Sequence, residues 1–306
     1  MSEPLLRVEH LVKEFPVRHL FRPDEMVRAV DDVTFEVQPG SAVGLVGESG
    51  SGKSTTAFCV MRLISPTSGR IVFRSEDVTN VSGPELKRLR RAMQIVFQDP
   101  YSSLNPRMQV EDIISEGLSI HKLVDSDEQR RARVVELLEM VGLEADHLRR
   151  KPSSFSGGQL QRIGIARALA VNPSLLICDE PVSSLDVSIQ AQILNLFREL
   201  QQQLQVTMLF IAHDLATVRH LCDYIVVMHD GRVVEQGPRE QVYGDPQDPY
   251  TKELMAAVPI PDPDLERERR QVRRRLAAAA AFDTITGGST TPGQSTARRA
   301  RPWRNS

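Results

Sequence analysis

A glycine-rich segment carries the clearest chemistry in this sequence of 306 residues. It matches the pattern G-x-x-x-x-G-K-[ST], because four residues separate Gly47 from Gly52, and Lys53 and Ser54 follow directly. Glycines let a backbone wrap closely around an anion, and the N–H groups at a helix start favour phosphate. The segment therefore predicts a nucleoside triphosphate site made by Gly47, Glu48, Ser49, Gly50, Ser51, Gly52, Lys53, Ser54 and Thr55.

Two adjacent carboxylates supply the other groups that phosphate chemistry needs. We expect Lys53 to reach the terminal phosphates and Ser54 to offer its hydroxyl to Mg²⁺. Asp179 and Glu180 end an apolar strand expected at 174–179, at the carboxyl edge where open α/β sheets bind ligands. We expect Asp179 to hold Mg²⁺ through water and Glu180 to accept the proton of the attacking water.

Short apolar strands alternate with amphipathic helices, and these elements must position the site. The pattern predicts the α/β fold class with a largely parallel sheet, including strands at 41–46, 174–179 and 207–212. The apolar stripe of 187–204 predicts a crossover helix, and Asp-Gly within 225–234 predicts a hairpin.

Two further helices are predicted beside these strands. A helix is expected at 55–63, directly after the glycine-rich segment, and another at 128–143. The stretch 99–166 has few strand-like runs, so we expect it to be a helical insertion.

Composition excludes several classes of protein. Apolar residues make up 41% and charged residues 25%, with a formal net charge of −2, as in ordinary soluble globular proteins. No run of 18 apolar residues would span a membrane, and the first residues lack a secretory pattern, so we expect a cytoplasmic location. Cys59, Cys178 and Cys222 lie in apolar contexts without metal-ligand spacing, which predicts buried thiols.

The charge is unevenly distributed along the chain. Residues 265–306 hold ten arginines against three acidic residues, a balance of +7 that leaves −9 on everything before them. This segment is rich in glycine, threonine and alanine, so we expect a mostly disordered basic tail with a helical stretch at 266–282. Aromatic residues hardly interrupt its arginines, and we expect no nucleic-acid partner.

A second motif identifies a family resemblance. The run Phe155-Ser-Gly-Gly-Gln-Leu-Gln-Arg162 resembles the signature motif of ABC-transporter ATPase subunits, and the other motifs follow in that family's order. The resemblance implies a P-loop NTPase core with a largely parallel sheet, an antiparallel β subdomain and a helical insertion. It also implies ATP and Mg²⁺ as cofactors and a head-to-tail dimer, in which the partner's nucleotide is contacted by Ser156, Gly157, Gly158 and Gln159.

The same resemblance assigns four further roles. Gln98 is similar to the Q-loop glutamine, which contacts Mg²⁺ or water, and His213 to the switch histidine that contacts the γ-phosphate. Asp186 resembles the D-loop aspartate and also suits a helix N-cap. Phe15 lies where the family has an aromatic ring stacked on adenine, more often a tyrosine, and a core phenylalanine is the alternative.

Two other runs narrow the resemblance to one branch. Residues 96–106 and 246–259 look like the oligopeptide, dipeptide and nickel importer branch, and Ile163-Gly-Ile-Ala-Arg-Ala168 resembles its F-type subunit. This implies an ATPase domain over 1–264. Its expected parts are a core at 1–98 and 167–240, a helical subdomain at 99–166 and an extension at 241–264. Some relatives hold an iron–sulfur cluster through cysteines near this extension, and we expect none because no cysteine follows Cys222.

The resulting prediction is an ATP-hydrolysing subunit that energises peptide import from the cytoplasmic face of the membrane. Its expected partners are a second ATPase, either a D-type relative or a second copy, two permease subunits and, indirectly, a solute-binding protein. Import of nickel or another solute, an exporter ATPase, an ABC ATPase acting on nucleic acid or ribosomes, and a non-hydrolysing scaffold stay open as alternatives.

Overall fold

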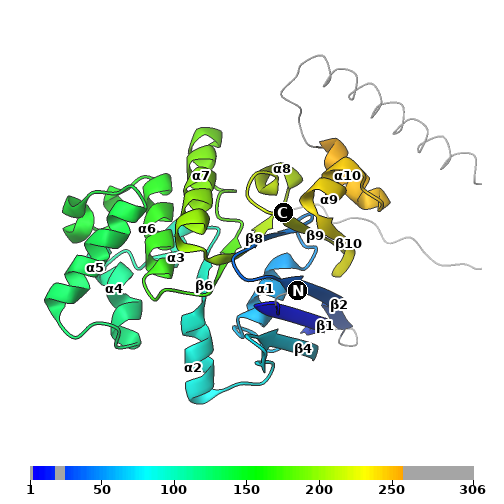
Figure 1. Cartoon of the computed structure of the whole chain (residues 1–306), viewed down its shortest axis with the longest axis horizontal. Coiled ribbons are helices and arrows are strands. Elements are labelled where there is room, and N and C mark those ends of the chain that lie inside the picture. Colours follow the sequence, from blue (N-terminus) through cyan, green and yellow to red (C-terminus); the bar gives the residue numbers. More distant parts are fainter. Residues whose placement is uncertain (1–2, 18–24, 258–306) are drawn as a thin grey trace, which may run out of the picture. The chain divides into compact units, whose positions relative to one another are not determined.

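Two sheets and their covering helices make up residues 3–17 and 25–257, the part that this computed structural model describes (Figure 1). The strands are β1 (Leu6–Val17), β2 (Glu25–Val37), β3 (Ala42–Val46), β4 (Ser68–Phe73), β5 (Glu76–Asp77), β6 (Met93–Val96), β7 (Leu175–Asp179), β8 (Thr207–Ala212), β9 (Tyr224–His229) and β10 (Arg232–Pro238). The α-helices are α1 (Lys53–Val60), α2 (Gly83–Ala92), α3 (Pro100–Ser103), α4 (Val110–Ile120), α5 (Asp127–Met140), α6 (Gly157–Leu169), α7 (Val187–Leu204), α8 (Leu215–Val218), α9 (Arg239–Gly244) and α10 (Pro249–Ala257). The 3₁₀ turns η1 (Ala145–Arg149) and η2 (Pro152–Ser154) lie between α5 and α6.

The six-stranded sheet is largely parallel, which confirms the predicted fold class. Its order is β10-β9-β3-β8-β7-β6, and only the β9–β10 pair is antiparallel. In the register, Val46 pairs with Ala212 and Asp179 pairs with Ile211, so β3, β7 and β8 end at the same edge. The residues that directly follow these strands therefore meet in space.

The predicted strands and crossover helix lie close to their predicted positions. Strand β8 and helix α7 have the expected bounds, while β3 and β7 each begin one residue later than expected. Helix α1 is shorter than the predicted 55–63 and begins two residues earlier, at Lys53. The β9–β10 hairpin turns at Asp230 and Gly231, whose φ angles are 46° and 81°, and left-handed backbone at both positions is what such a tight hairpin requires.

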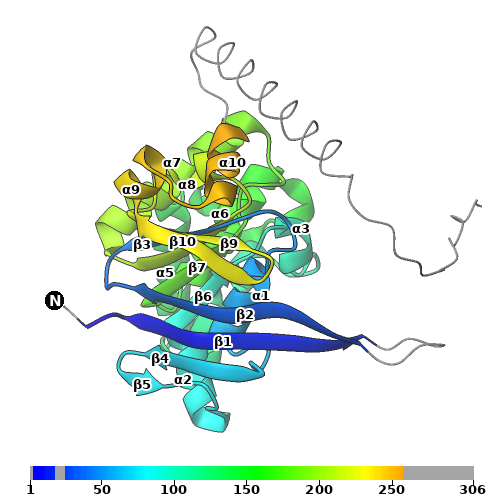
Figure 2. The ribbon, with the colours of Figure 1, turned by 90° about the vertical axis from the view of Figure 1, so that its right-hand side faces the viewer.

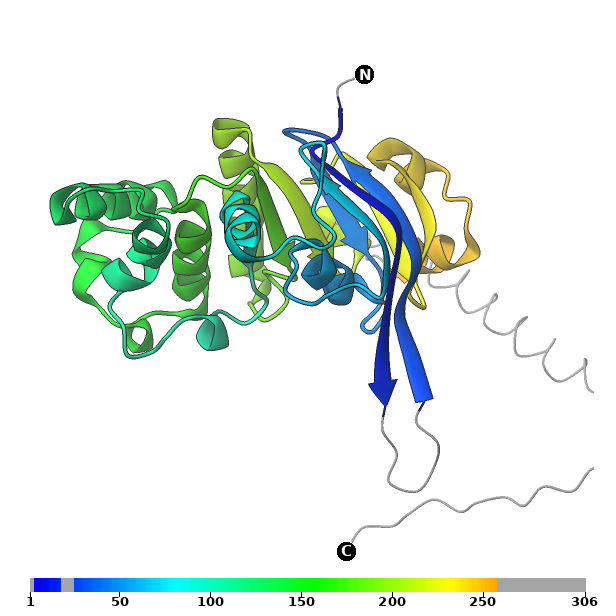
Figure 3. The ribbon, with the colours of Figure 1, turned by 90° about the horizontal axis from the view of Figure 1, so that it is seen from below.

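A second, antiparallel sheet packs on the first. Its order is β2-β1-β4-β5, and Figure 2 shows it below β9 and β10. Side chains of α1 share one buried cluster with this sheet and with one face of the parallel sheet, as Ala57, Val8 and Leu45 show. Strands β1 and β2, the blue pair in Figure 3, run on together beyond the other strands. The antiparallel subdomain that the resemblance implied is therefore present.

The stretch between β6 and β7 is helical, as predicted. Helices α3 to α6 lie there, and α5 matches the expected helix at 128–143 apart from its last turn. Their apolar faces share a second buried cluster with α7 and the other face of the parallel sheet. Helices α4, α5 and α6 lie together at the left of Figure 1. Burial of these apolar faces holds the helices against one another, because each helix has an apolar face that must be kept from water.

Three further sequence predictions concern the cysteines, membrane-spanning helices and the basic tail. All three cysteines are buried and free, as expected. None of the helices within 3–17 and 25–257 combines the length and apolar character needed to cross a membrane. The basic tail at 265–306, its helical stretch at 266–282 and the end of the predicted extension lie outside the described residues.

Candidate nucleotide-binding site

The predicted phosphate loop joins β3 to α1, and its shape depends on glycine. Gly52 precedes α1 with a φ of 96°, and a Cβ there would lie 2.3 Å from the Ala29 carbonyl oxygen. A Cβ on Gly47 would lie 2.1 Å from the Met228 carbonyl oxygen. Both contacts are impossible, so these two positions require glycine for the close approach of the backbone. The loop therefore ends with free N–H groups at the start of a helix, where an anion is stabilised.

Lys53 points into this loop and is almost completely buried, with 3% exposure. Its Nζ donates to the Gly47 and Glu48 carbonyl oxygens at 2.7 Å each and to Ser51 Oγ at 3.3 Å. Burial lowers the pKa of the Lys53 ammonium, and nearby carboxylates, of which Glu180 is the strongest, oppose that shift. The lysine is thus a buried donor, aimed at the space that the loop encloses.

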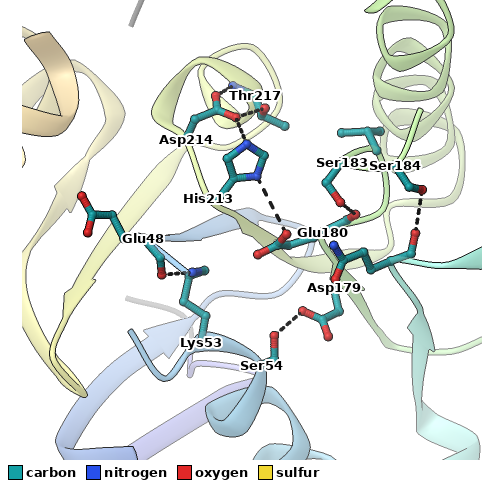
Figure 4. A network of polar contacts seen from close by, with 12 residues as sticks. Glu48, Lys53, Ser54, Asp179, Glu180, Ser183, Ser184, His213, Asp214 and Thr217 are labelled. Atoms are coloured by element: carbon teal, nitrogen blue, oxygen red, sulfur yellow. Dashed lines mark hydrogen bonds and ion pairs between the residues drawn. The ribbon is translucent and has the colours of Figure 1, made fainter. Parts of the chain in front are cut away.

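Asp179 faces the first turn of α1 across the sheet edge. Its Oδ1 accepts a hydrogen bond of 2.8 Å from Ser54 Oγ, as Figure 4 shows. Burial raises the pKa of the Asp179 carboxyl, while the bond from Ser54 works in the opposite direction. A hydroxyl and a nearly buried carboxylate are hard oxygen donors, the chemistry that Mg²⁺ prefers. The two residues therefore fit a magnesium site.

Glu180 has an unusual backbone. Its φ of 46° is left-handed, which is costly for a residue other than glycine. Three hydrogen bonds hold it there: its N–H donates to the Ile211 carbonyl at 3.1 Å, and its own carbonyl accepts from Ser183 N at 3.2 Å and Ser183 Oγ at 3.0 Å. This backbone turns the carboxylate away from the strand and toward His213 (Figure 4).

His213 completes the polar array. Its Nδ1 lies 3.8 Å from Glu180 Oε2, and its Nε2 lies 3.4 Å from Asp214 Oδ2. Asp214 is itself fixed, because its carboxylate caps α8 by accepting 2.8 Å bonds from Thr217 N and Thr217 Oγ1. The imidazole is half-exposed, so it can reach a ligand from the solvent side.

Gln98 joins the same site through the loop after β6. It lines a cavity of about 240 Å³ with Glu180, Ala29, Ser49, Gly50, Gly52, Lys53, Ser54 and Thr55. Ser184 Oγ donates to the Gln98 carbonyl at 3.1 Å, and the buried Gln161 amide donates to the Phe97 carbonyl at 3.3 Å. A larger hollow of about 510 Å³, lined by residues between 73 and 92, contains none of the predicted site residues.

The signature residues lie elsewhere in the described part of the chain. Ser156 caps α6 in a reciprocal box, with Ser156 N donating to Gln159 Oε1 at 3.0 Å and Gln159 N donating to Ser156 Oγ at 3.4 Å. Gly158 is packed against Ile189, whose Cγ2 would lie 2.5 Å from an added Cβ. Neither Ser156, Gly157, Gly158 nor Gln159 lines the cavity beside Lys53.

Asp186 and Phe15 do not line that cavity either. Asp186 caps α7, as its sequence position suggested, accepting from Ile189 N at 3.1 Å and Ser188 Oγ at 2.7 Å, and these bonds lower the pKa of its carboxyl. Phe15 lies on β1 with its ring partly exposed and the Lys13 Nζ 4.8 Å from the ring centre. An exposed ring is available for stacking, which is the arrangement that an adenine contact requires.

Several contacting residues were not predicted. Ser184 and Gln161 support the site through hydrogen bonds, and Asp214 supports it through the 3.4 Å contact of its Oδ2 with His213 Nε2. Asp214 had a usable signal, because an aspartate that precedes a short helix commonly acts as an N-cap. The other two had none, since their partners are backbone carbonyls distant in sequence.

Comparisons with known proteins agree on the family. The ABC transporter family model matches residues 30–183, and the model of the oligopeptide/dipeptide transporter C-terminal region matches 234–288. The second match runs past residue 264, the expected end of the extension.

The curated relatives are similar over most of their length. The oligopeptide transport ATP-binding protein OppF of Bacillus subtilis is 53% identical over 88% of this chain and 87% of its own. The dipeptide transport ATP-binding protein DppF of Lactococcus lactis is 51% identical over 80% of this chain and 79% of its own.

Solved structures share the fold. A dimeric, post-hydrolysis ATP-binding cassette bound to ADP and Pi superposes with a TM-score of 0.69 at 29% identity, covering 76% of this chain and 98% of that one. The cassette cbiO1 of Clostridium perfringens gives 0.68 at 29% identity, covering 80% and 92%. The chain is therefore a member of the ABC transporter ATPase family, in its oligopeptide/dipeptide transporter branch.

Proposed function

We propose that the array at the ends of β3, β7 and β8 is the catalytic site of an ATPase subunit that powers import of oligopeptides or dipeptides. The observation that carries this proposal is the convergence of Lys53, Ser54, Asp179, Glu180 and His213 on one space (Figure 4). The two family matches support the substrate class, because the second one covers the region specific to oligopeptide and dipeptide transporters.

The phosphate loop would hold ATP by its backbone and by one charged side chain. The N–H groups of Lys53, Ser54 and Thr55 lie in the first turn of α1, where the helix dipole favours negative charge. Lys53 would turn its buried ammonium from the loop carbonyls to the terminal phosphate oxygens. A charge-assisted bond of this kind is stronger than a neutral one, so the exchange favours ATP binding.

Ser54, Asp179 and Gln98 are the residues that would hold Mg²⁺. Their oxygens come from three separate elements, and Ser54 and Asp179 already lie within hydrogen-bonding distance of each other. The ion bound there would neutralise charge on the phosphate oxygens. Asp179 would supply the negative charge that the cation needs in a nearly buried place.

Glu180 would accept a proton from the water that attacks the terminal phosphate. Its left-handed backbone and the bonds from Ser183 fix the carboxylate at the edge of the cavity. His213 would donate to the same phosphate, held in place by Asp214. Gln98, which lines the same cavity, would orient the water. Each group acts by position, which is the main source of catalysis in phosphoryl transfer.

A second cassette would cover the solvent side of the site. Ser156 is exposed at the start of α6, a helix N-terminus suited to the terminal phosphate of a partner's ATP. A structural neighbour is described as a dimer bound to ADP and Pi, which supports this arrangement. Gly157, Gly158, Gln159 and Asp186 would join that interface, and Phe15 would stack on adenine.

The remaining parts of the proposal concern assembly. The core at 1–98 and 167–240 would carry catalysis, and the helical subdomain at 99–166 would contact two permease subunits at the cytoplasmic face of the membrane. The extension at 241–264 would distinguish this branch from other ABC transporter ATPases. Residues 265–306 would remain a separate basic tail. The second ATPase would be a D-type relative or a second copy of this chain.

One experiment tests the function as a whole. In cells that lack this gene, uptake of a labelled peptide is measured after returning the wild-type chain or the Lys53→Ala variant. We expect uptake with the first and none with the second, and ATP turnover by the purified wild-type chain that stops when EDTA removes Mg²⁺. Peptide uptake that Lys53→Ala restores fully, or turnover that EDTA leaves unchanged, would contradict the proposal.

A further inference from the structure

Tyr250, on the last described helix, contacts the phosphate loop. Its hydroxyl oxygen accepts a hydrogen bond of 2.9 Å from the backbone N–H of Glu48. The carbonyl of Glu48 in turn accepts from Lys53 Nζ at 2.7 Å. One peptide segment of the loop therefore links α10 to the lysine that is aimed at the phosphates.

The position of Tyr250 is fixed by its ring. The ring packs on His229, at the end of β9, with 3.9 Å between ring centres and an angle of 31° between planes. Tyr250 N also donates to Asp248 Oδ1 at 2.8 Å. With its ring and backbone both held, the hydroxyl has little freedom to leave the loop.

Helix α10 is anchored to the sheet as well. Glu235 on β10 accepts bonds of 2.9 Å from Gln247 N and 3.0 Å from Asp248 N, just before the helix begins. A carboxylate at a helix N-terminus is favourably placed. Thr251, one residue after the tyrosine, is completely buried. The helix therefore presents Tyr250 from a rigid support.

The loop backbone is held at a second point by the β9–β10 turn. Gly231 N donates to the Ser51 carbonyl at 3.2 Å. The bonds at Ser51 and Glu48 lie on either side of the exposed stretch at 49–50. They fix both ends of that stretch, in a loop rich in glycine that would otherwise have many conformations.

We propose that Tyr250 is a positioning residue for the phosphate loop, through which the C-terminal extension sets the affinity for ATP. This inference rests on the assignment of residues 47–54 as the ATP phosphate site. A loop that is already ordered loses less conformational entropy when it binds a ligand. The loop contacts the phosphates before and during the reaction, so its ordering acts on KM and leaves kcat nearly unchanged.

A matched pair of variants separates this role from simple packing. Tyr250→Phe removes the hydroxyl and keeps the ring on His229. Tyr243→Phe, on α9, removes a hydroxyl that donates to the Leu215 carbonyl, away from the loop. Both changes delete one hydroxyl bond from the same end of the chain, so a general loss of stability affects both.

The measurements are calorimetric titration of the full chain with ATP and Mg²⁺, steady-state turnover and thermal unfolding. For Tyr250→Phe we expect Kd and KM to rise by about threefold to tenfold, the effect of one lost hydrogen bond, with kcat within about twofold. Tyr243→Phe keeps the wild-type Kd and KM. Equal changes in Kd for both variants, or a fall in kcat without a rise in KM, would overturn the inference.

Lys53→Ala distinguishes a failure of this inference from a failure of the proposed site. If Lys53→Ala loses ATP affinity and Tyr250→Phe binds as the wild type does, only the role of Tyr250 is wrong. If Lys53→Ala binds ATP as tightly as the wild type, residues 47–54 are not the phosphate site and both proposals fail.

Discussion

The hydroxyl of Ser184 donates a 3.1 Å hydrogen bond to the backbone carbonyl of Gln98, joining the segment after β7 to the loop after β6. Ser184 follows Glu180 closely, so the bond connects the proposed base to the proposed water-orienting glutamine. The buried Gln161 amide holds the neighbouring Phe97 carbonyl. Two side chains from different elements thus fix the backbone on which Gln98 depends.

Ser184→Ala is expected to lower kcat by about twofold to tenfold, the range for losing one neutral hydrogen bond. The change frees the Gln98 backbone and misplaces its side chain, while the phosphate loop and KM are unaffected. Steady-state ATP turnover measures both constants. Ser119→Ala is the control, because its hydroxyl also bonds a backbone carbonyl, at 3.3 Å, but within α4. A wild-type kcat in Ser184→Ala would show that this bond has no role in catalysis.

Glu180→Gln is expected to reduce ATP turnover by about 100-fold to 10,000-fold, because the amide cannot accept the proton of the attacking water. ATP still binds, so the protein should accumulate as an ATP-bound dimer, which sedimentation velocity detects. Glu199→Gln, an exposed change on α7, is the control and keeps wild-type turnover. Near-normal turnover in Glu180→Gln would remove the assignment of the base.

We expect the thiol of Cys59 to make the protein less stable as the pH becomes alkaline. Burial raises the pKa of its thiol to about 11, from 9.0. The folded pKa is above the unfolded one, so its contribution is complete below pH 9 and is lost as the pH rises toward 11. Relative to Cys59→Ala, the wild type should lose roughly 2 kcal/mol of unfolding free energy across that window. Urea denaturation at several pH values measures this, and a constant difference between the two proteins would contradict it.

The sequence predicted the elements of the site better than its supporting bonds. Helix α7 follows from its apolar periodicity, and strand β8 follows from a continuous apolar run that is buried on both faces; the bounds of both were predicted correctly. The parallel register then brings Asp179 beside Ile211 and so places the catalytic residues at one edge. The local sequence pattern and the parallel topology are therefore sufficient to predict where the catalytic residues meet.

Other features depend on tertiary contacts that no local pattern records. The left-handed backbone of Glu180 is stabilised by the Ile211 carbonyl and by Ser183, and glutamate has no preference for that conformation. The bond from Glu48 N to Tyr250 joins two residues that are 202 positions apart in the sequence. Both become visible only when the fold has brought the partners together.

Ser156→Arg tests whether the signature acts on the nucleotide of a second protomer. Ser156 is exposed and does not line the cavity beside Lys53, so an arginine there would not touch ATP bound by its own loop. We expect ATP affinity of the variant to match the wild type in calorimetric titration of dilute protein. Turnover should fall by at least about 100-fold, because a large cation at the start of α6 blocks closure against the partner and removes the cap.

Ser153→Arg, at an exposed position just before the signature, is the control for the added charge and keeps wild-type turnover. Two results would refute action across the dimer. One is a loss of ATP affinity in Ser156→Arg alone, which would place the signature at its own chain's nucleotide. The other is unchanged turnover in Ser156→Arg at a protein concentration where the wild type is dimeric, because the terminal phosphate would then need no second helix N-terminus.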